Sequence, residues 1–344
     1  MLNAPSVTIL AIACMLAGLR ALATQGTPVG AVHAREPVEL KLPESWANVE
    51  CYRWLADGKM IVRYNTGKEA QSHTGEYAPW SGSWRPLPWL DAASTPLSDS
   101  EDNLFEASPD STMLLFYSNG NQIVSGLDGQ KRVTSAYPVD RSWWAPDSNS
   151  WVGMRAVPGT GATELALDSV APERADGNAP RRWYDLGRHY LVAGMVTSTE
   201  VLVVSEAVQS VQNGWASVKS FDLAKYRSSR RQWRMSVPDL TTVKDAKVSP
   251  DGRRLCWLLV LNSQRLNVRG SRDFPGNVEI GFWVSGTDGI GLHRLWSYDL
   301  KPDRVDLLDH GWYRMGGPSG VQWLPDSSRI SFRWNHKQWT LDAK

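Results

Sequence analysis

The sequence is poor in cysteine and has almost no net charge. Only Cys14, Cys51 and Cys256 occur among its 344 residues, and we expect no disulfide between the last two, because they belong to repeat units that would not be neighbours. The 37 basic and 36 acidic residues nearly cancel. A protein without a strong field of one sign does not recruit nucleic acid or an anionic membrane over a distance, so neither is expected as a partner.

Sequence patterns of several kinds of active site are also missing. There is no Gly-x-Ser-x-Gly motif of the α/β-hydrolase type, and no two histidines stand at the spacing of a metal site. After residue 35, apolar residues do not recur with a helical period over ten or more positions. These absences favour an all-β protein, and we expect neither a metal nor a cofactor.

A short turn motif recurs along the chain instead. It is Pro-Asp or Ala-Asp followed by glycine or serine, and a run of β-branched or aromatic residues follows each copy. The gaps between successive turn aspartates are 53, 37, 104 and 75 residues, and these aspartates are Asp57, Asp110, Asp147, Asp251 and Asp326. The gap of 104 is two periods of 52, which predicts a degenerate copy at Thr197–Glu200, before Val201–Val204. Six units with such a period indicate a solenoid, a propeller or an array.

The chemistry of the motif selects among these architectures. Proline favours the second position of a type I turn, aspartate accepts hydrogen bonds from N–H groups just ahead of it, and glycine or serine completes the reversal. Each unit therefore begins with a hairpin, and a second pair of strands usually follows, as at residues 122–129 and 294–300. Four short strands make a propeller blade, so we predict one six-bladed β-propeller over residues 35–344.

Two segments carry a family resemblance. Val248–Leu255 reads Val-Ser-Pro-Asp-Gly-Arg-Arg-Leu, and Leu127–Gly129 reads Leu-Asp-Gly. The repeat resembles that of TolB-like (WD40-like) propellers over residues 36–344, although the fourth unit lacks Pro-Asp. The resemblance implies the fold, and it implies protein or peptide partners in the cell envelope. It implies no particular activity, because propellers host enzymes, binders and scaffolds alike.

The N-terminus has the pattern of a secretory signal over residues 1–34. The apolar run Val7–Leu19 is too short to span a bilayer, and small-residue cleavage sites follow that end at Ala23 or Ala34. We therefore expect an exported protein, periplasmic or secreted, whose mature chain has no membrane span. A lipoprotein anchored through Cys14 is the alternative.

The last unit ends after three strands, one short of a blade. Residues 37–42 alternate apolar and polar side chains ahead of the first turn, so we predict that they supply the missing outer strand. Closing the ring in this way pairs two strand edges that would otherwise be open. A loose N-terminal extension is the alternative.

Tryptophan is abundant, with 18 residues. Trp54, Trp144 and Trp323 stand at the same position, three residues before a turn aspartate, where other units have alanine or valine. A residue type fixed by its place in the repeat indicates packing between blades rather than stacking on a ligand. Three tryptophans outside this register are better surface candidates: Trp80, Trp84 and Trp89.

The candidate binding site lies on the loops opposite the Pro-Asp turns. The long gap before the sixth turn predicts extra residues within 262–291, with Phe282–Val284 in an ordered hairpin over the channel mouth. A ring of loops on a rigid frame gives a concave site with convergent polar groups. The candidate residues are His73, Arg141, Arg188, His189, Arg269, Arg272, His310, Trp312, Arg314 and His336.

These features favour a monomeric, non-enzymatic protein that binds a protein or peptide partner through this loop face. The alternative is a lyase or hydrolase acting on a polysaccharide or peptide at the channel mouth, which would need carboxylates or histidines within a few ångströms of each other. Carbohydrate is the second class of partner considered. An assembly subunit would instead expose a large apolar patch. The arginine-rich run Arg227–Arg234 is expected on an outer strand rather than at a nucleic-acid site.

Overall fold

In the computed structural model, the chain divides into two units, residues 1–33 and 34–344. All described residues belong to the second unit. The expected signal segment and its cleavage sites therefore lie outside them. The structure describes residues 35–46, 48–67, 72–93, 105–118, 121–135, 139–160, 162–170, 182–187, 190–205, 215–225, 227–236, 241–261, 278–300, 317–335 and 337–344.

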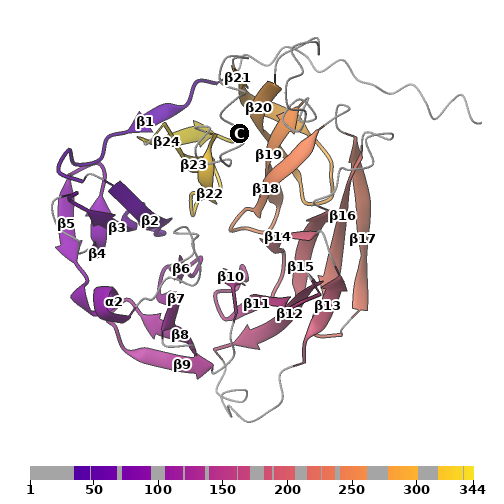
Figure 1. Ribbon diagram of the computed structural model, residues 1–344, viewed down its shortest axis with the longest axis horizontal. Helices are drawn as coiled ribbons and strands as arrows, with labels where there is room; N and C mark the ends of the chain where they lie inside the picture. The colour runs from indigo at the N-terminus through magenta and orange to yellow at the C-terminus, as the bar shows by residue number, and fades with distance from the viewer. Residues whose placement is uncertain are drawn as a thin grey trace, which may run out of the picture. The chain divides into compact units, whose positions relative to one another are not determined.

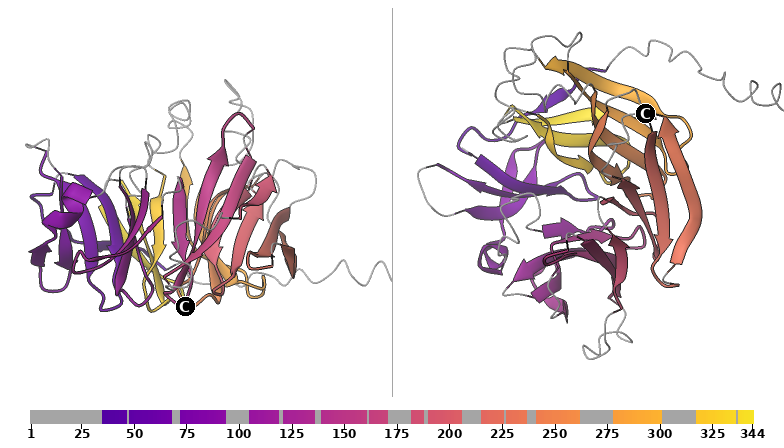
Figure 2. Two further views of the ribbon diagram at one scale, coloured as in Figure 1. Left: turned by 90° about the horizontal axis from the view of Figure 1, so that it is seen from below. Right: turned by 45° about the vertical axis from the view of Figure 1, so that its right-hand side comes forward.

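The second unit is a ring of six antiparallel sheets, each of four strands (Figure 1). In each sheet one strand lies nearest the centre of the ring and another forms the periphery. Seen from the side, the six sheets stand next to one another with their strands running between the two faces of the ring (Figure 2). The predicted six-bladed β-propeller is thus confirmed.

Within each blade the strands follow one another from the centre outward. Blade one contains β2 (Asn48–Trp54), β3 (Met60–Asn65), β4 (His73–Ala78) and β5 (Ser83–Pro86). Blade two contains β6 (Phe105–Ala107), β7 (Met113–Ser118), β8 (Asn121–Gly126) and β9 (Lys131–Ser135), after the short helix α2 (Pro88–Ala93). Blade three contains β10 (Arg141–Trp144), β11 (Ser150–Val157), β12 (Ala162–Ser169) and β13 (Tyr184–Gly187).

The second half of the ring repeats this order. Blade four contains β14 (Tyr190–Met195), β15 (Glu200–Ser205), β16 (Trp215–Asp222) and β17 (Arg227–Ser236). Blade five contains β18 (Thr242–Val248), β19 (Arg254–Leu261), β20 (Val278–Gly286) and β21 (His293–Leu300). Blade six contains β22 (Ser319–Trp323), β23 (Arg329–Trp334), β24 (Lys337–Asp342) and, as its outer strand, β1 (Val38–Leu40).

Strand β1 closes the ring, as the alternation of residues 37–42 predicts. Val38 pairs with Thr340 and Leu40 with Gln338, in antiparallel register. The Lys337 ammonium also lies 2.8 Å from a Glu39 carboxylate oxygen. The first described strand of the propeller thus completes the last blade and joins the two ends of the ring.

The degenerate fourth unit is also confirmed. The backbone N–H of Val196 donates to the carbonyl of Glu200 at 2.9 Å, which closes a turn between β14 and β15. Leu55 and Lys59 close the first turn in the same way at 2.8 Å. A turn without Pro-Asp can therefore still start a blade, because the strand-forming run that follows it is intact.

Serine hydroxyls connect successive turns around part of the ring. Ser111, Ser148 and Ser327 follow their turn aspartates and adopt left-handed φ angles of 60°, 57° and 55°. The Ser148 hydroxyl accepts a hydrogen bond of 3.0 Å from the N–H of Asp110, in the preceding blade. Ser111 accepts similarly from Ala56, and Ser327 from Asp251. The repeated motif therefore serves contact between blades as well as the turn itself.

The repeat tryptophans pack between blades, as their shared position predicts. The indole N–H of Trp144 donates to the carbonyl of Glu106 in blade two, and that of Trp323 donates to the carbonyl of Lys247 in blade five. Trp54 donates to the hydroxyl of Ser331 in blade six at 2.7 Å. Each indole thus bonds to a neighbouring blade while burying much of its ring.

The other tryptophan candidates have different surroundings. The Trp80 side chain is 64% exposed, whereas Trp84 packs edge-on against Trp46 and Tyr64. Trp89 lies against the Phe116 ring. Only Trp80 among these three is a prominent surface residue.

Two further segments are placed by the strands. Phe282–Val284 lies in β20, the regular third strand of blade five, and not in an added hairpin over the channel. The run is ordered and forms an antiparallel hairpin with β21, but its predicted place over the channel mouth was wrong, because Phe282 and Val284 belong to the core of the blade. Arg227–Arg234 lies in β17, the outer strand of blade four, as expected.

In the part of the chain that the structure describes, none of the helices has the length and apolar composition of a membrane span.

Candidate functional site

A cavity of about 380 Å³ occupies the centre of the ring. The inner strands of all six blades contribute to its lining. It extends from Pro109, Pro146 and Pro250 of the repeated turns to Arg141 and Lys244 near the opposite ends of their strands. The cavity is therefore the central channel of the propeller.

One residue from each blade forms a layer in this channel. Each of these residues lies on the inner strand of its blade and pairs with an equivalent position on the second strand. In the repeat, each stands one residue before the position that Trp54, Trp144 and Trp323 occupy. Outside blade four, each stands four residues before its turn aspartate. We call them the channel layer: Arg53, Glu106, Trp143, Gly194, Lys247 and Gln322.

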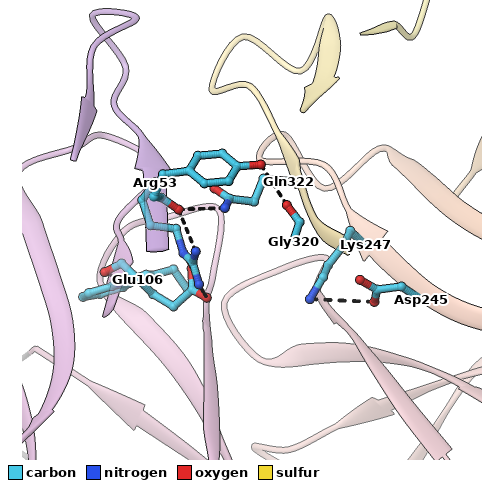
Figure 3. Close-up of polar contacts among 8 residues, drawn as sticks. Arg53, Glu106, Asp245, Lys247, Gly320 and Gln322 are labelled. Atoms are coloured by element: carbon cyan, nitrogen blue, oxygen red, sulfur yellow. Dashed lines mark hydrogen bonds and ion pairs between the residues drawn. The ribbon is translucent and has the colours of Figure 1, made fainter. Parts of the chain in front are cut away.

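Arg53 and Glu106 form a two-pronged ion pair across blades one and two (Figure 3). The guanidinium Nε and Nη2 atoms donate to the two carboxylate oxygens at 2.8 and 2.7 Å. Nη1 donates to the Tyr52 carbonyl at 2.7 Å. Arg53 is only 7% exposed, so this pairing satisfies a charge that would be costly to bury alone.

Gln322 links blade six to blade one in the same layer. Its side-chain amide donates to the Tyr52 carbonyl at 2.7 Å, and the Tyr52 hydroxyl donates back to the Gly320 carbonyl at 2.9 Å (Figure 3). Arg53 and Gln322 thus share one carbonyl acceptor. This side of the channel is fixed by polar contacts between blades.

Blades three to five form the opposite side of the channel. Gly194 has no side chain, and the Lys247 ammonium lies 6.0 Å from the centre of the Trp143 ring. Lys247 also lies 3.8 Å from an oxygen of Asp245, a weaker approach than the Arg53–Glu106 pair (Figure 3). Blade four contributes only uncharged residues to the lining, namely Leu191, Ala193, Gly194 and Met195.

Two of the predicted site residues are described, and they lie apart. Arg141, at the start of β10, lines the channel. His73 begins β4, the third strand of blade one, where its ring lies 5.7 Å from that of Tyr64, and it is not among the residues lining the channel. The remaining predicted residues lie outside the described residues: Arg188, His189, Arg269, Arg272, His310, Trp312, Arg314 and His336.

None of the six channel-layer residues is among the candidate residues predicted from the sequence. The signal was present, because Arg53, Glu106 and Lys247 stand four residues before a turn aspartate. The predicted role of the repeat concerned only the next position, where the tryptophans stand. Within the described ranges, no three histidine, cysteine, aspartate or glutamate side chains are grouped as metal ligands would be.

Comparison with known proteins bears on the fold. No family model and no curated protein matches this chain. Similar solved structures include a putative TolB from Agrobacterium tumefaciens, 12% identical, with 73% of this chain and 81% of that chain covered and a TM-score of 0.45. Oligogalacturonate lyase from Vibrio parahaemolyticus is 11% identical, with coverage of 91% and 95% and a TM-score of 0.48.

Hydrazine synthase from Kuenenia stuttgartiensis is also similar, with 13% identity, coverage of 90% of this chain and 76% of that chain, and a TM-score of 0.46. Identities this low concern the fold alone. The predicted propeller itself is confirmed by the structure, in which the chain forms six four-stranded blades closed by its N-terminal strand.

Proposed function

We propose that this protein is an exported, non-enzymatic binding protein whose central channel receives a segment of a protein or peptide. The observation that carries the proposal is the channel cavity of about 380 Å³, to which all six inner strands contribute. Its size lies within the usual range for ligand pockets, and its walls combine apolar residues with a few fixed polar groups, as in many binding sites.

The rigidity of the channel supports binding. Arg53, Glu106 and Gln322 are held by hydrogen bonds between blades, so part of the layer is ordered before a ligand arrives. Preorganised groups lose less conformational entropy on binding than mobile ones. A propeller channel of this kind suits an extended segment that enters from one face.

The catalytic alternative has weaker support in the described channel. Acid–base chemistry needs a carboxylate or histidine able to exchange a proton with the substrate. Both Glu106 oxygens accept hydrogen bonds from Arg53, and Asp245 lies beside Lys247 and accepts from the Ala246 N–H at 2.8 Å. These carboxylates are oriented toward protein groups, which suits a structural or binding role better than proton transfer.

Photo-crosslinking in source cells tests the proposal. Benzoylphenylalanine at position 247, in the channel layer, should form adducts with a protein or peptide. The same amino acid at position 131, an exposed residue on the outer strand β9, is the matched control and should give no such adduct. Equal adducts at both positions, or none at position 247, would contradict binding in the channel.

The export part of the proposal has a separate test. The signal-like pattern of residues 1–34 supports it, with cleavage expected after Ala23 or Ala34. The intact mass of protein isolated from source cells should correspond to one of these mature chains. Recovery of the complete chain from the cytosolic fraction would overturn export, whereas lipid attached to Cys14 would support the anchored alternative.

A further inference from the structure

The charges of the channel are unevenly distributed. On the side of blades one and two, Arg53 is neutralised by Glu106. On the side of blades three to five, the lining contains Arg141, Lys244 and Lys247 but only one carboxylate, that of Asp245. Among the described residues, Arg141 has no ion-pair partner. The lining of this side therefore contains more cationic than anionic side chains.

The surface between these cations is apolar. Blade four lies between blades three and five and lines the channel with the half-buried Leu191, whereas Ala193 and Met195, which are 1% and 2% exposed, pack mainly into the cores between blades. The Trp143 ring is next to this strip, near the Lys247 ammonium. Gly194 lines the channel through its backbone, and the space that a side chain would take there is next to the Val248 side chain.

We propose that the bound segment is an acidic peptide, which rests on the peptide-binding function proposed above. A carboxylate, from aspartate, glutamate or a C-terminus, would bind Arg141 with Lys244 or Lys247 beside it. An adjacent apolar side chain would lie over Gly194 and against Leu191. Arginine binds carboxylates through paired N–H donors, and an excess of positive charge favours ligands of the opposite sign.

A peptide fits this lining better than an acidic oligosaccharide does. Sugars require hydrogen-bonding groups for their many hydroxyls, whereas blade four, between the cations of blades three and five, contributes only Leu191, Ala193, Gly194 and Met195 to the lining. Acidic oligosaccharide is therefore the competing outcome of the test.

The test begins with a random heptapeptide library panned on the immobilised full-length protein. Enriched peptides should contain aspartate or glutamate at one shared position. The best binder is then synthesised with a fluorescent label, together with the same peptide carrying asparagine or glutamine at that position. Fluorescence anisotropy should show about tenfold weaker binding of the amide peptide, as expected for loss of one charge-assisted hydrogen bond.

Variants of the protein locate the carboxylate. Arg141→Gln should weaken binding of the acidic peptide about tenfold and leave binding of the amide peptide almost unchanged. Lys244→Gln, at an exposed side chain, is a second variant that keeps the test valid if Arg141→Gln folds poorly. Arg294→Gln removes an exposed cation on outer strand β21 and is the matched control, with no effect on either peptide.

The outcomes separate this inference from the proposed function. If acidic and amide peptides bind equally, or the enriched peptides are neutral or basic, the acidic inference fails while peptide binding stands. If the library enriches no peptide but labelled trigalacturonate binds and Arg141→Gln abolishes it, peptide binding fails and a carbohydrate ligand replaces it. If neither probe binds, both proposals fail.

Discussion

The Lys247 ammonium lies 6.0 Å from the centre of the Trp143 ring, although the two residues belong to blades five and three. Blade four lies between them, and its residue in the channel layer is Gly194. A cation at this distance is attracted by the negative face of an indole ring. Blades three and five thus bring an aromatic ring and a cation close together in the channel layer.

Replacing Gly194 by alanine should destabilise the propeller. Its φ of 134° is a conformation that residues with a Cβ atom rarely adopt, and an added Cβ would lie 3.3 Å from the Val248 Cβ. Backbone strain of this kind costs about 1–3 kcal/mol. We therefore expect Gly194→Ala to lower the free energy of unfolding by about that amount, measured by urea denaturation.

Gly82→Ala provides the matched control for backbone conformation. Gly82 also has a positive φ, of 67°, but an added Cβ would meet nothing within 4 Å. The left-handed region tolerates a side chain better than the backbone conformation of Gly194 does. We therefore expect Gly82→Ala to lower the free energy of unfolding by only about 1 kcal/mol. An unchanged stability of Gly194→Ala, or an equal loss in both variants, would show that the fourth blade adapts to a side chain in the channel layer.

The Arg53–Glu106 pair should contribute more than a surface ion pair does. Glu106→Gln removes the negative charge and one good acceptor from an arginine whose side chain is only 9% exposed. The expected loss in the free energy of unfolding is about 2 kcal/mol. This is less than for a fully buried pair, because the Glu106 side chain is 31% exposed. Urea denaturation at neutral pH measures it.

Glu279→Gln is the comparison for that prediction. Glu279 pairs with Arg294 at 2.9 Å on the outer half of blade five, where the arginine side chain is 44% exposed. Exposed pairs contribute about 0–1 kcal/mol. Similar losses in the two variants would mean that the channel pair has no special role in holding blades one and two together.

The serine connection between turns predicts a loss of stability on removal of the Ser148 hydroxyl. Ser148→Ala leaves the N–H of Asp110 without its acceptor, at a cost of about 1 kcal/mol. Ser148→Gly removes the same hydroxyl but adopts the left-handed φ of 57° without strain, so it should lose less. If the glycine variant is the less stable one, the hydrogen bond is not the main contribution of this residue.

Much of the fold could be predicted because it depends on local chemistry repeated along the chain. Asp57, Asp110 and Asp326 mark turns by their own hydrogen bonding, and the runs after them have the composition of strands. The fourth blade could be placed by spacing alone. The closing strand β1 was predictable because a blade with three strands leaves an edge that needs a partner.

The channel site was less predictable, for a physical reason. Local turn chemistry does not determine which side chains of different blades meet at the centre of the ring. Arg53 and Glu106 are 53 residues apart and pair only because consecutive inner strands lie side by side. Aligning the units by their turns would have brought these residues into one layer. The loop residues proposed from the sequence, such as Arg269 and His310, lie outside the described residues.

The repeated turns should also make stability depend on pH below about 4. Burial raises the pKa of Asp110, but hydrogen bonds from Ser108 and Thr112 outweigh it, so the pKa lies below its ordinary value of 3.8. The pKa of Asp326 is lowered in the same way, with burial opposed by hydrogen bonds from Ser328. A carboxylate with a lowered pKa in the folded state stabilises the protein above its unfolded pKa, and this contribution is lost as the pH falls through the folded value.

Asp110→Asn isolates this effect. The amide cannot ionise, so the variant should have a lower Tm than the wild type at pH 6, and this difference should shrink as the pH falls below the ordinary aspartate pKa of 3.8 toward the lowered pKa of the folded state. Ser108→Ala retains the carboxylate but removes one donor to it, so the folded pKa of Asp110 should rise toward its ordinary value, and the acid-induced loss of Tm should be smaller and end at a higher pH than in the wild type. Parallel curves of Tm against pH for all three proteins would mean that ionisation of Asp110 is not coupled to folding.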